Sequence, residues 1–184
     1  MPRRGRRKWG VFHGLCLAVG GNRIALRSAI MGIPSDLDPS SYRRDASVPT
    51  FPDDRPIFVF DGKCVLCSAA AQFVLRHDRK ARFRLLRAQT PLGAAIYAHY
   101  GLDPKDYQTN LVLENGMVWL KSESSIRIFE RLGFPWSLAA VARVLPLKLR
   151  DRLYDVVARN RFNWFGRRET CLVSMPKYAD RFLK

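Results

Sequence analysis

Residues 57–67, with the sequence IFVFDGKCVLC, contain the features that decide the fold. The first four form an uninterrupted apolar run, which is typical of a short strand buried on both faces. An Asp-Gly pair ends this run, and residues 65–77 then have helical spacing with few helix-breaking residues. Cys64 and Cys67 therefore stand at the start of a helix that directly follows a buried strand.

Downstream of this helix the chain continues to alternate between strands and helices. Residues 82–87 (RFRLLR) predict a second strand, and residues 92–100 predict a second helix. Gly101 follows at the position where glycine commonly ends a helix. The two strands are expected to pair in parallel because a helix connects them.

An antiparallel pair and a third helix are predicted next. Asn115-Gly116 between two short apolar runs is the strongest local signal for a β-hairpin. Ser124 or Ser125 is expected to cap a third helix, which ends at Gly133. The predicted order of elements, β-α-β-α-β-β-α, is that of an α/β protein with a thioredoxin-like fold.

The segments that flank this core differ from it in composition. Residues 1–55 begin with a basic run and continue into a Pro-, Ser- and Asp-rich stretch without periodicity, so we expect them to be disordered or poorly ordered. Residues 56–176 are predicted to form the thioredoxin-like domain with a C-terminal helical extension, and residues 177–184 a short tail. Apolar residues of the extension, from Leu138 to Val157, recur at helical spacing, which predicts packing against the domain.

Net charge, cysteine content and apolar runs indicate which classes of partner and which kinds of protein fit this sequence. A net charge of +16 would attract nucleic acid, anionic membranes or acidic proteins, and it also fits a solvated basic surface. Four cysteines in 184 residues are too few for a secreted disulfide scaffold. No stretch reaches the ~20 apolar residues of a spanning helix. The apolar run at residues 9–18 lacks a small-residue cleavage site, so we expect a cytoplasmic protein without a transmembrane span.

The cysteine pair has the position and spacing of a reactive dithiol. Unpaired backbone N–H groups and the helix dipole at a helix start stabilise a thiolate, which lowers the pKa of Cys64 from the free value of ~8.5. Lys63 would act in the same direction if its ammonium group approaches the sulfur. Cys67 lies one turn later, within disulfide distance. We therefore expect Cys64 to attack a disulfide and Cys67 to resolve the mixed disulfide.

Two residues before the pair support the same chemistry. Asp61 could accept the Cys67 proton during resolution, or it could cap the turn. Gly62 permits a tight turn between strand and helix. We expect no cofactor; the expected partners are a protein or low-molecular-weight disulfide or thiol, and a cellular thiol reductant.

The Asp61, Cys64 and Cys67 pattern resembles the signature of the DCC family of thiol-disulfide oxidoreductases. The resemblance extends from about residue 57 to residue 176. It includes Cys171 and the later segments 150–154, 158–162 and 165–168. It implies a thioredoxin-like fold and redox activity at the cysteine pair. Compared with thioredoxins, Val65-Leu66 replaces Gly-Pro between the cysteines, and Thr109-Asn110 takes the place of the cis-proline before the third strand.

The sequence is also compatible with two other functions. A structural zinc site would need Cys171 and either His77 or His99 in addition to the cysteine pair, although no second close pair is present. Residues 159–168 interleave arginines with aromatic residues, as in proteins that bind single-stranded nucleic acid, but no recognised nucleic-acid-binding module accompanies them. We expect instead that Arg161 and Arg167 lie near the cysteines and support a thiolate or an anionic substrate.

Overall fold

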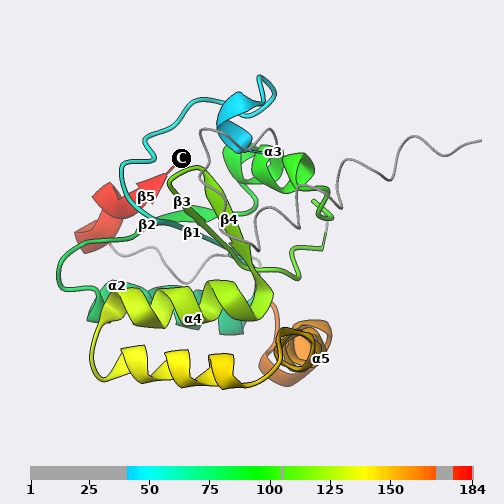
Figure 1. Ribbon diagram of the computed structural model, residues 1–184. Coiled ribbons are helices and arrows are strands. Elements are labelled where there is room, and N and C mark those ends of the chain that lie inside the picture. The colour runs from blue at the N-terminus through cyan, green and yellow to red at the C-terminus, as the bar shows by residue number, and fades with distance from the viewer. Residues whose placement is uncertain (1–40, 105, 169–175, 184) are drawn as a thin grey trace, which may run out of the picture.

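A five-stranded mixed sheet organises the protein (Figure 1). The computed structural model describes residues 41–104, 106–168 and 176–183. The strands are β1 (Ile57–Phe60), β2 (Arg84–Arg87), β3 (Leu111–Glu114), β4 (Met117–Leu120) and β5 (Phe182–Leu183). They lie in the order β4-β3-β1-β2-β5. The β1–β2 and β2–β5 pairs are parallel, and the β1–β3 and β3–β4 pairs are antiparallel.

Helices cover both faces of this sheet (Figure 1). The α-helices are α2 (Val65–His77), α3 (Pro91–His99), α4 (Lys121–Leu132) and α5 (Leu147–Phe165). Three 3₁₀-helices are η1 (Tyr42–Arg44), η2 (Trp136–Val144) and η3 (Pro176–Arg181). Helices α2 and α4 lie on one face, and α3 and η1 lie on the other. Beyond α4, η2 and α5 form an outer layer on the side remote from α3.

The alternation of side chains along β1 explains why both faces are covered. Ile57 and Val59 belong to the core beneath α3, whereas Phe58 and Phe60 belong to the core beneath α2. All four side chains are fully enclosed, as the apolar run predicted. The predicted thioredoxin-like α/β class is confirmed by this mixed sheet and its covering helices.

Two of the predicted turns have the backbone conformation that their residues favour. Asn115 and Gly116 both have positive φ, 51° and 73°, as a two-residue hairpin turn between β3 and β4 requires. Gly101 follows α3 with a φ of 61°, which glycine adopts without steric cost. The hairpin turn pairs β4 with β3, which begins directly after Asn110.

The predicted serine cap of the third helix is wrong. Helix α4 begins at Lys121, immediately after β4, and no side chain caps it. Ser124 lies inside the first turn, where its hydroxyl donates to the Lys121 carbonyl oxygen at 2.8 Å. A serine hydroxyl inside a helix can also bond back to a carbonyl three or four residues earlier, so a serine near a helix start is not always its cap. Sequence alone did not reveal that strand and helix join without a loop.

The core is extended at both ends of the described chain. Tyr42 is buried in the core, and its hydroxyl donates to Asp53 at 2.8 Å. Residues 41–55 are therefore folded, unlike the predicted poorly ordered segment 1–55 to which they were assigned; residues 1–40 lie outside the described part. At the other end, β5 pairs with β2 within what was predicted as a tail.

The predicted burial of the apolar C-terminal stripe is also wrong. Its members are exposed to solvent: Leu138, Val141, Leu145, Leu149, Leu153, Val156 and Val157. Helix α5 instead buries Ala158 and Arg161 against the domain. Arg161 can lie there because buried carboxylate and carbonyl groups pair with it, which hydrophobic periodicity does not reveal.

Candidate active site

The cysteine pair lies at the carboxyl end of β1, where the chain turns into α2. Cys64 is the N-cap residue of α2, and its Sγ accepts a hydrogen bond from the Cys67 backbone N–H at 3.3 Å. The side chain of Cys67 also hydrogen bonds to Cys64. Neither cysteine is in a disulfide bond. The predicted arrangement, two cysteines one turn apart at a helix start, is present.

These hydrogen bonds make the two thiols chemically unequal. The pKa of Cys64 is lowered to about 6, chiefly because the Cys67 side chain donates to its sulfur, with a further contribution from the Cys67 amide. The pKa of Cys67 is raised well above its usual value because its proton is shared with Cys64 and because it is buried. At neutral pH the pair is therefore one thiolate, on Cys64, and one thiol.

Both sulfur-bearing residues are enclosed, with 1% of Cys64 and 7% of Cys67 exposed. Residues 166–168, which follow α5 and which we call the covering segment, contribute to this enclosure. Arg167 forms a backbone bridge with Cys64. Arg168 N–H donates to the Lys63 carbonyl at 2.9 Å, and Val65 N–H donates to the Gly166 carbonyl at 3.4 Å. A substrate must therefore displace or pass this segment to reach the thiolate.

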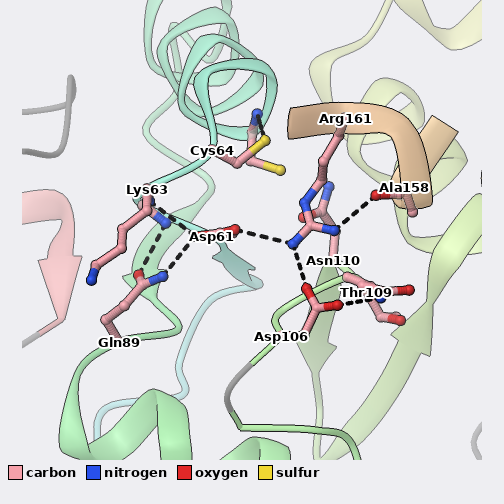
Figure 2. Close-up of polar contacts among 12 residues, drawn as sticks. Asp61, Lys63, Cys64, Gln89, Asp106, Thr109, Asn110, Ala158 and Arg161 are labelled. Atoms are coloured by element: carbon pink, nitrogen blue, oxygen red, sulfur yellow. Dashed lines mark hydrogen bonds and ion pairs between the residues drawn. The ribbon is translucent and has the colours of Figure 1, made fainter. Parts of the chain in front are cut away.

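Asp61 is buried beneath the pair and accepts three hydrogen bonds (Figure 2). Its Oδ1 accepts from the Lys63 N–H at 2.9 Å and from the Gln89 side-chain amide at 2.6 Å. Its Oδ2 accepts from Arg161 at 3.3 Å. The Gln89 side-chain oxygen accepts in turn from the Gly62 N–H at 3.0 Å, so the loop before Cys64 is fixed on both sides.

Arg161 reaches this site from α5 and is 3% exposed. Its guanidinium group lies between the carboxylates of Asp61 and Asp106, at 3.3 and 2.9 Å, and donates to the Ala158 carbonyl at 2.8 Å (Figure 2). A buried cation requires such partners to offset its lost hydration. The positive charge of Arg161 also lowers the pKa values of both cysteines.

The other predicted basic residues take different positions around the pair. The Lys63 side chain points away from Cys64 (Figure 2), so its ammonium group does not approach the sulfur. The Arg167 guanidinium lies over the Phe162 ring, 5.1 Å from its centroid. Lys63 and Arg167 line, together with Asp61, Asp106 and Arg161, a polar hollow of about 500 Å³ beside the cysteine loop.

Comparison with known proteins matches this region to one family. The family model described as "DCC1-like thiol-disulfide oxidoreductase" matches residues 58–167, which include the cysteine pair, Asp61, Gln89, Asp106 and Arg161. The chain belongs to this family. It is 32% identical over 127 residues to "Uncharacterized protein YuxK" of Bacillus subtilis, covering 69% of this chain and 93% of that protein. It is 37% identical over 120 residues to "DCC family protein At1g52590, chloroplastic" of Arabidopsis thaliana, covering 65% of this chain and 70% of that protein.

No solved structure gives a significant match to this DCC1-like chain. Within the described residues, none of the helices has the length and apolar character needed to cross a bilayer. The described part also contains no group of three or more His, Cys, Asp or Glu residues that could hold a metal ion. Cys171, which the zinc alternative would require, and Cys16 lie outside the described residues.

Three residues of this DCC1-like site were missed by sequence reasoning. Gln89 follows β2 as Asp61 follows β1, and the carboxyl ends of neighbouring parallel strands meet at one edge, so that pattern could have indicated Gln89. Asp106 lies in an irregular loop and gives no such signal. The Tyr154 hydroxyl, from α5, accepts from the Asn110 N–H at 2.8 Å. The backbone N–H before β3, at the place where thioredoxins have their cis-proline, is thus already hydrogen bonded to Tyr154.

Proposed function

We propose that this protein catalyses thiol–disulfide exchange, with Cys64 as the nucleophile and Cys67 as the resolving thiol. The observation that carries the proposal is the pair of Cys67 hydrogen bonds on the Cys64 sulfur, which lower the pKa of Cys64 to about 6. A thiolate is the reactive form in disulfide exchange, and its optimum pKa lies near ambient pH. Membership of the family supports the same reaction class.

In the first step the Cys64 thiolate attacks one sulfur of a substrate disulfide. A bond forms between Cys64 and that sulfur, the substrate S–S bond breaks, and the other substrate sulfur leaves as a thiolate. Formation of the mixed disulfide removes the negative charge from Cys64. The Cys67 thiol then loses the acceptor that raised its pKa, so its proton becomes easier to remove.

In the second step Cys67 gives its proton to the Asp61 carboxylate and attacks the Cys64 sulfur. The Cys64–Cys67 bond forms and the second substrate sulfur leaves as a thiolate, so the substrate gains two electrons and the pair loses two. Asp61 is suited to this role because it is buried and its charge already acts on Cys67. Its hydrogen bonds from Lys63 and Gln89 hold the carboxylate in place, so turn capping and proton acceptance are compatible.

We propose protein or low-molecular-weight disulfides as substrates, with a cellular thiol reductant returning the pair to the dithiol. The polar hollow beside the loop supplies a binding surface, with Lys63 and Arg167 available for anionic groups of the substrate. We propose that the reaction runs towards reduction of the substrate, as the two steps above are written.

The Cys67→Ser variant tests this assignment. It retains the attacking thiolate but lacks the resolving thiol, so incubation with a model disulfide should accumulate a mixed disulfide on Cys64, detectable by peptide mass spectrometry. The matched control is Cys64→Ser, which should form no adduct at Cys67. If both variants reduce the model disulfide at the parent rate, the proposed reaction is refuted.

A further inference from the structure

Exposed apolar side chains are concentrated in one part of the molecule. Among the described residues, every large hydrophobic side chain that is exposed lies between Phe134 and Phe165. These residues belong to η2, α5 and the turns beside them, which form the layer farthest from α3 and η1 (Figure 1). Single exposed apolar residues are ordinary, but a continuous group of this kind marks an interaction surface.

Helix η2 presents one apolar row to solvent. Leu138, Val141 and Val144 are spaced by three residues, and a 3₁₀-helix has three residues per turn, so they project from the same side. They are 61%, 66% and 84% exposed. The opposite side of η2 packs on α4, so this row is an outward face of the folded protein.

Helix α5 presents a second row with a basic border. Five exposed apolar side chains form one stripe along the helix, because their spacings of about three, four and seven residues keep them on the same side. They are Leu149, Leu153, Val156, Val157 and Trp164. The exposed basic residues of α5 occupy a narrow row that adjoins this stripe. They are Lys148, Arg152 and Arg159, at intervals of four and seven residues.

Charge on this part of the surface has a single sign. Between residues 131 and 168 every exposed charged side chain is basic. The acidic residues of that segment, Asp151 and Asp155, are partly buried and bound to Ser122 and Lys121 of α4. The face thus combines apolar rows, an uncompensated basic border and exposed aromatic rings at the end of α5, features that amphipathic helices use to lie in a lipid interface.

We propose that η2 and α5 form a docking face for an anionic membrane surface. Apolar side chains would enter the headgroup region, and Lys148, Arg152 and Arg159 would contact anionic headgroups. A second copy of the chain fits less well, because a two-fold interface would bring two basic borders together. Nucleic acid would engage the basic border but leave the apolar rows in water. The proposal does not depend on the thiol chemistry.

Vesicle binding by the full chain tests this proposal. We expect co-sedimentation with phosphatidylcholine vesicles that contain phosphatidylglycerol, weaker binding at high salt, and little binding to phosphatidylcholine alone. Arg152→Glu should weaken binding roughly fivefold or more, because each basic side chain near an anionic surface contributes about that factor. Leu153→Gln should weaken it roughly tenfold through the loss of apolar burial.

Two matched variants distinguish binding through this face from binding through the net charge or through the thiols. Arg44→Glu makes the same charge change at an exposed site on η1, on the far side of the molecule, and should alter binding less than about twofold because charges there are screened. Cys64→Ser should bind as the parent does, whatever its redox activity. The proposal is overturned if Arg152→Glu and Leu153→Gln bind vesicles as the parent does. It is also overturned if the parent chain does not bind vesicles and is instead a dimer that Leu153→Gln dissociates.

Discussion

Cys64 combines an acidic thiol with an enclosed position. The Cys67 side chain and amide stabilise its thiolate, and the covering segment limits access to it. Acidity and accessibility usually rise together at a helix start, but in this protein different residues control them. The two properties can therefore be measured separately.

The pH dependence of Cys64 alkylation should reveal its acidity. Below pH 6 the thiol is protonated and unreactive; the rate should rise as the pH passes about 6 and then level off, since the pKa is lowered to about 6. Iodoacetamide labelling of the reduced chain, followed by peptide mapping, measures this midpoint. Cys67→Ala removes the main hydrogen-bond donor and should move the midpoint upward, and an unchanged midpoint would contradict the assigned cause.

Asp61 and Asp106 both bind Arg161, and Asp61 also accepts a hydrogen bond from the Cys64 N–H at its backbone carbonyl. Asp61→Asn keeps a hydrogen-bonding group of the same size and loses the proton acceptor, so resolution of the mixed disulfide should slow by roughly 10²-fold. Asp106→Asn is the matched control and should slow it only a few-fold. Quenched-flow measurement of mixed-disulfide lifetime distinguishes them, and equal slowing would assign the effect to Arg161 rather than to proton transfer.

At the scale of elements, the contact between α3 and the end of β2 depends on one glycine. A Cβ atom on Gly93 would lie 2.4 Å from the Arg87 carbonyl oxygen and 2.8 Å from the Ala88 backbone. Backbone atoms cannot move aside as a flexible side chain can. Gly93 thus lets α3 lie close to the strand that leads to Gln89.

Gly93→Ala should therefore destabilise the protein by about 1–3 kcal/mol through overpacking. Helix propensity alone predicts the opposite sign, a gain of about 1 kcal/mol. Urea denaturation measures the difference. The exposed Ala98→Gly change in the same helix should cost the ordinary amount, about 1 kcal/mol. A Gly93→Ala variant more stable than the parent would show that α3 shifts freely on the sheet.

Local signals predicted the elements well where one residue type determines the backbone. The apolar run of β1, the Asn115-Gly116 turn and the helix that begins after Cys64 all follow from such signals. The same local signals gave wrong predictions where contacts with distant residues determine the structure. Ser124 resembles a cap but bonds within its own turn, and the apolar stripe of α5 faces water because Arg161 and Ala158 occupy the inner face.

At the scale of the whole molecule, residues far apart in the chain complete the site. The Asp61–Arg161 pair joins residues that are 100 positions apart, and its existence depends on how α5 returns to the sheet. No local pattern contains that information. The arginine- and aromatic-rich segment 159–168 led to the hypothesis that Arg161 and Arg167 lie near the cysteines, while the polar network that binds Arg161 follows only from the structure.

The C-terminus is held by a second buried ion pair. Arg181 donates to Asp78 and to the Phe83 carbonyl, at 3.1 Å from Nε and 2.8 Å from Nη2, and both Arg181 and Asp78 are buried. Arg181→Ala would leave Asp78 buried without its cation. We expect a loss of about 3 kcal/mol in the free energy of unfolding, measured with urea.

Arg84→Ala is the matched control for this prediction. Arg84 pairs with Asp54, which is largely exposed, so the variant should lose less than about 1 kcal/mol. If Arg181→Ala also loses less than about 1 kcal/mol, burial does not strengthen the Arg181 contact and β5 contributes little to the stability of the sheet.

The covering segment has a consequence for selectivity. An acidic thiolate in open water is readily oxidised by peroxide towards sulfenic acid and beyond. Gly166 and Arg168 bond to Val65 and Lys63 beside Cys64, which is 1% exposed, so we expect dissolved reagents to reach its sulfur more slowly than at an open helix start. A polypeptide that pairs with the same backbone groups as an extended strand can replace the segment and reach the sulfur. We therefore expect the covering segment to favour partners that can take its place, in addition to any difference in redox potential.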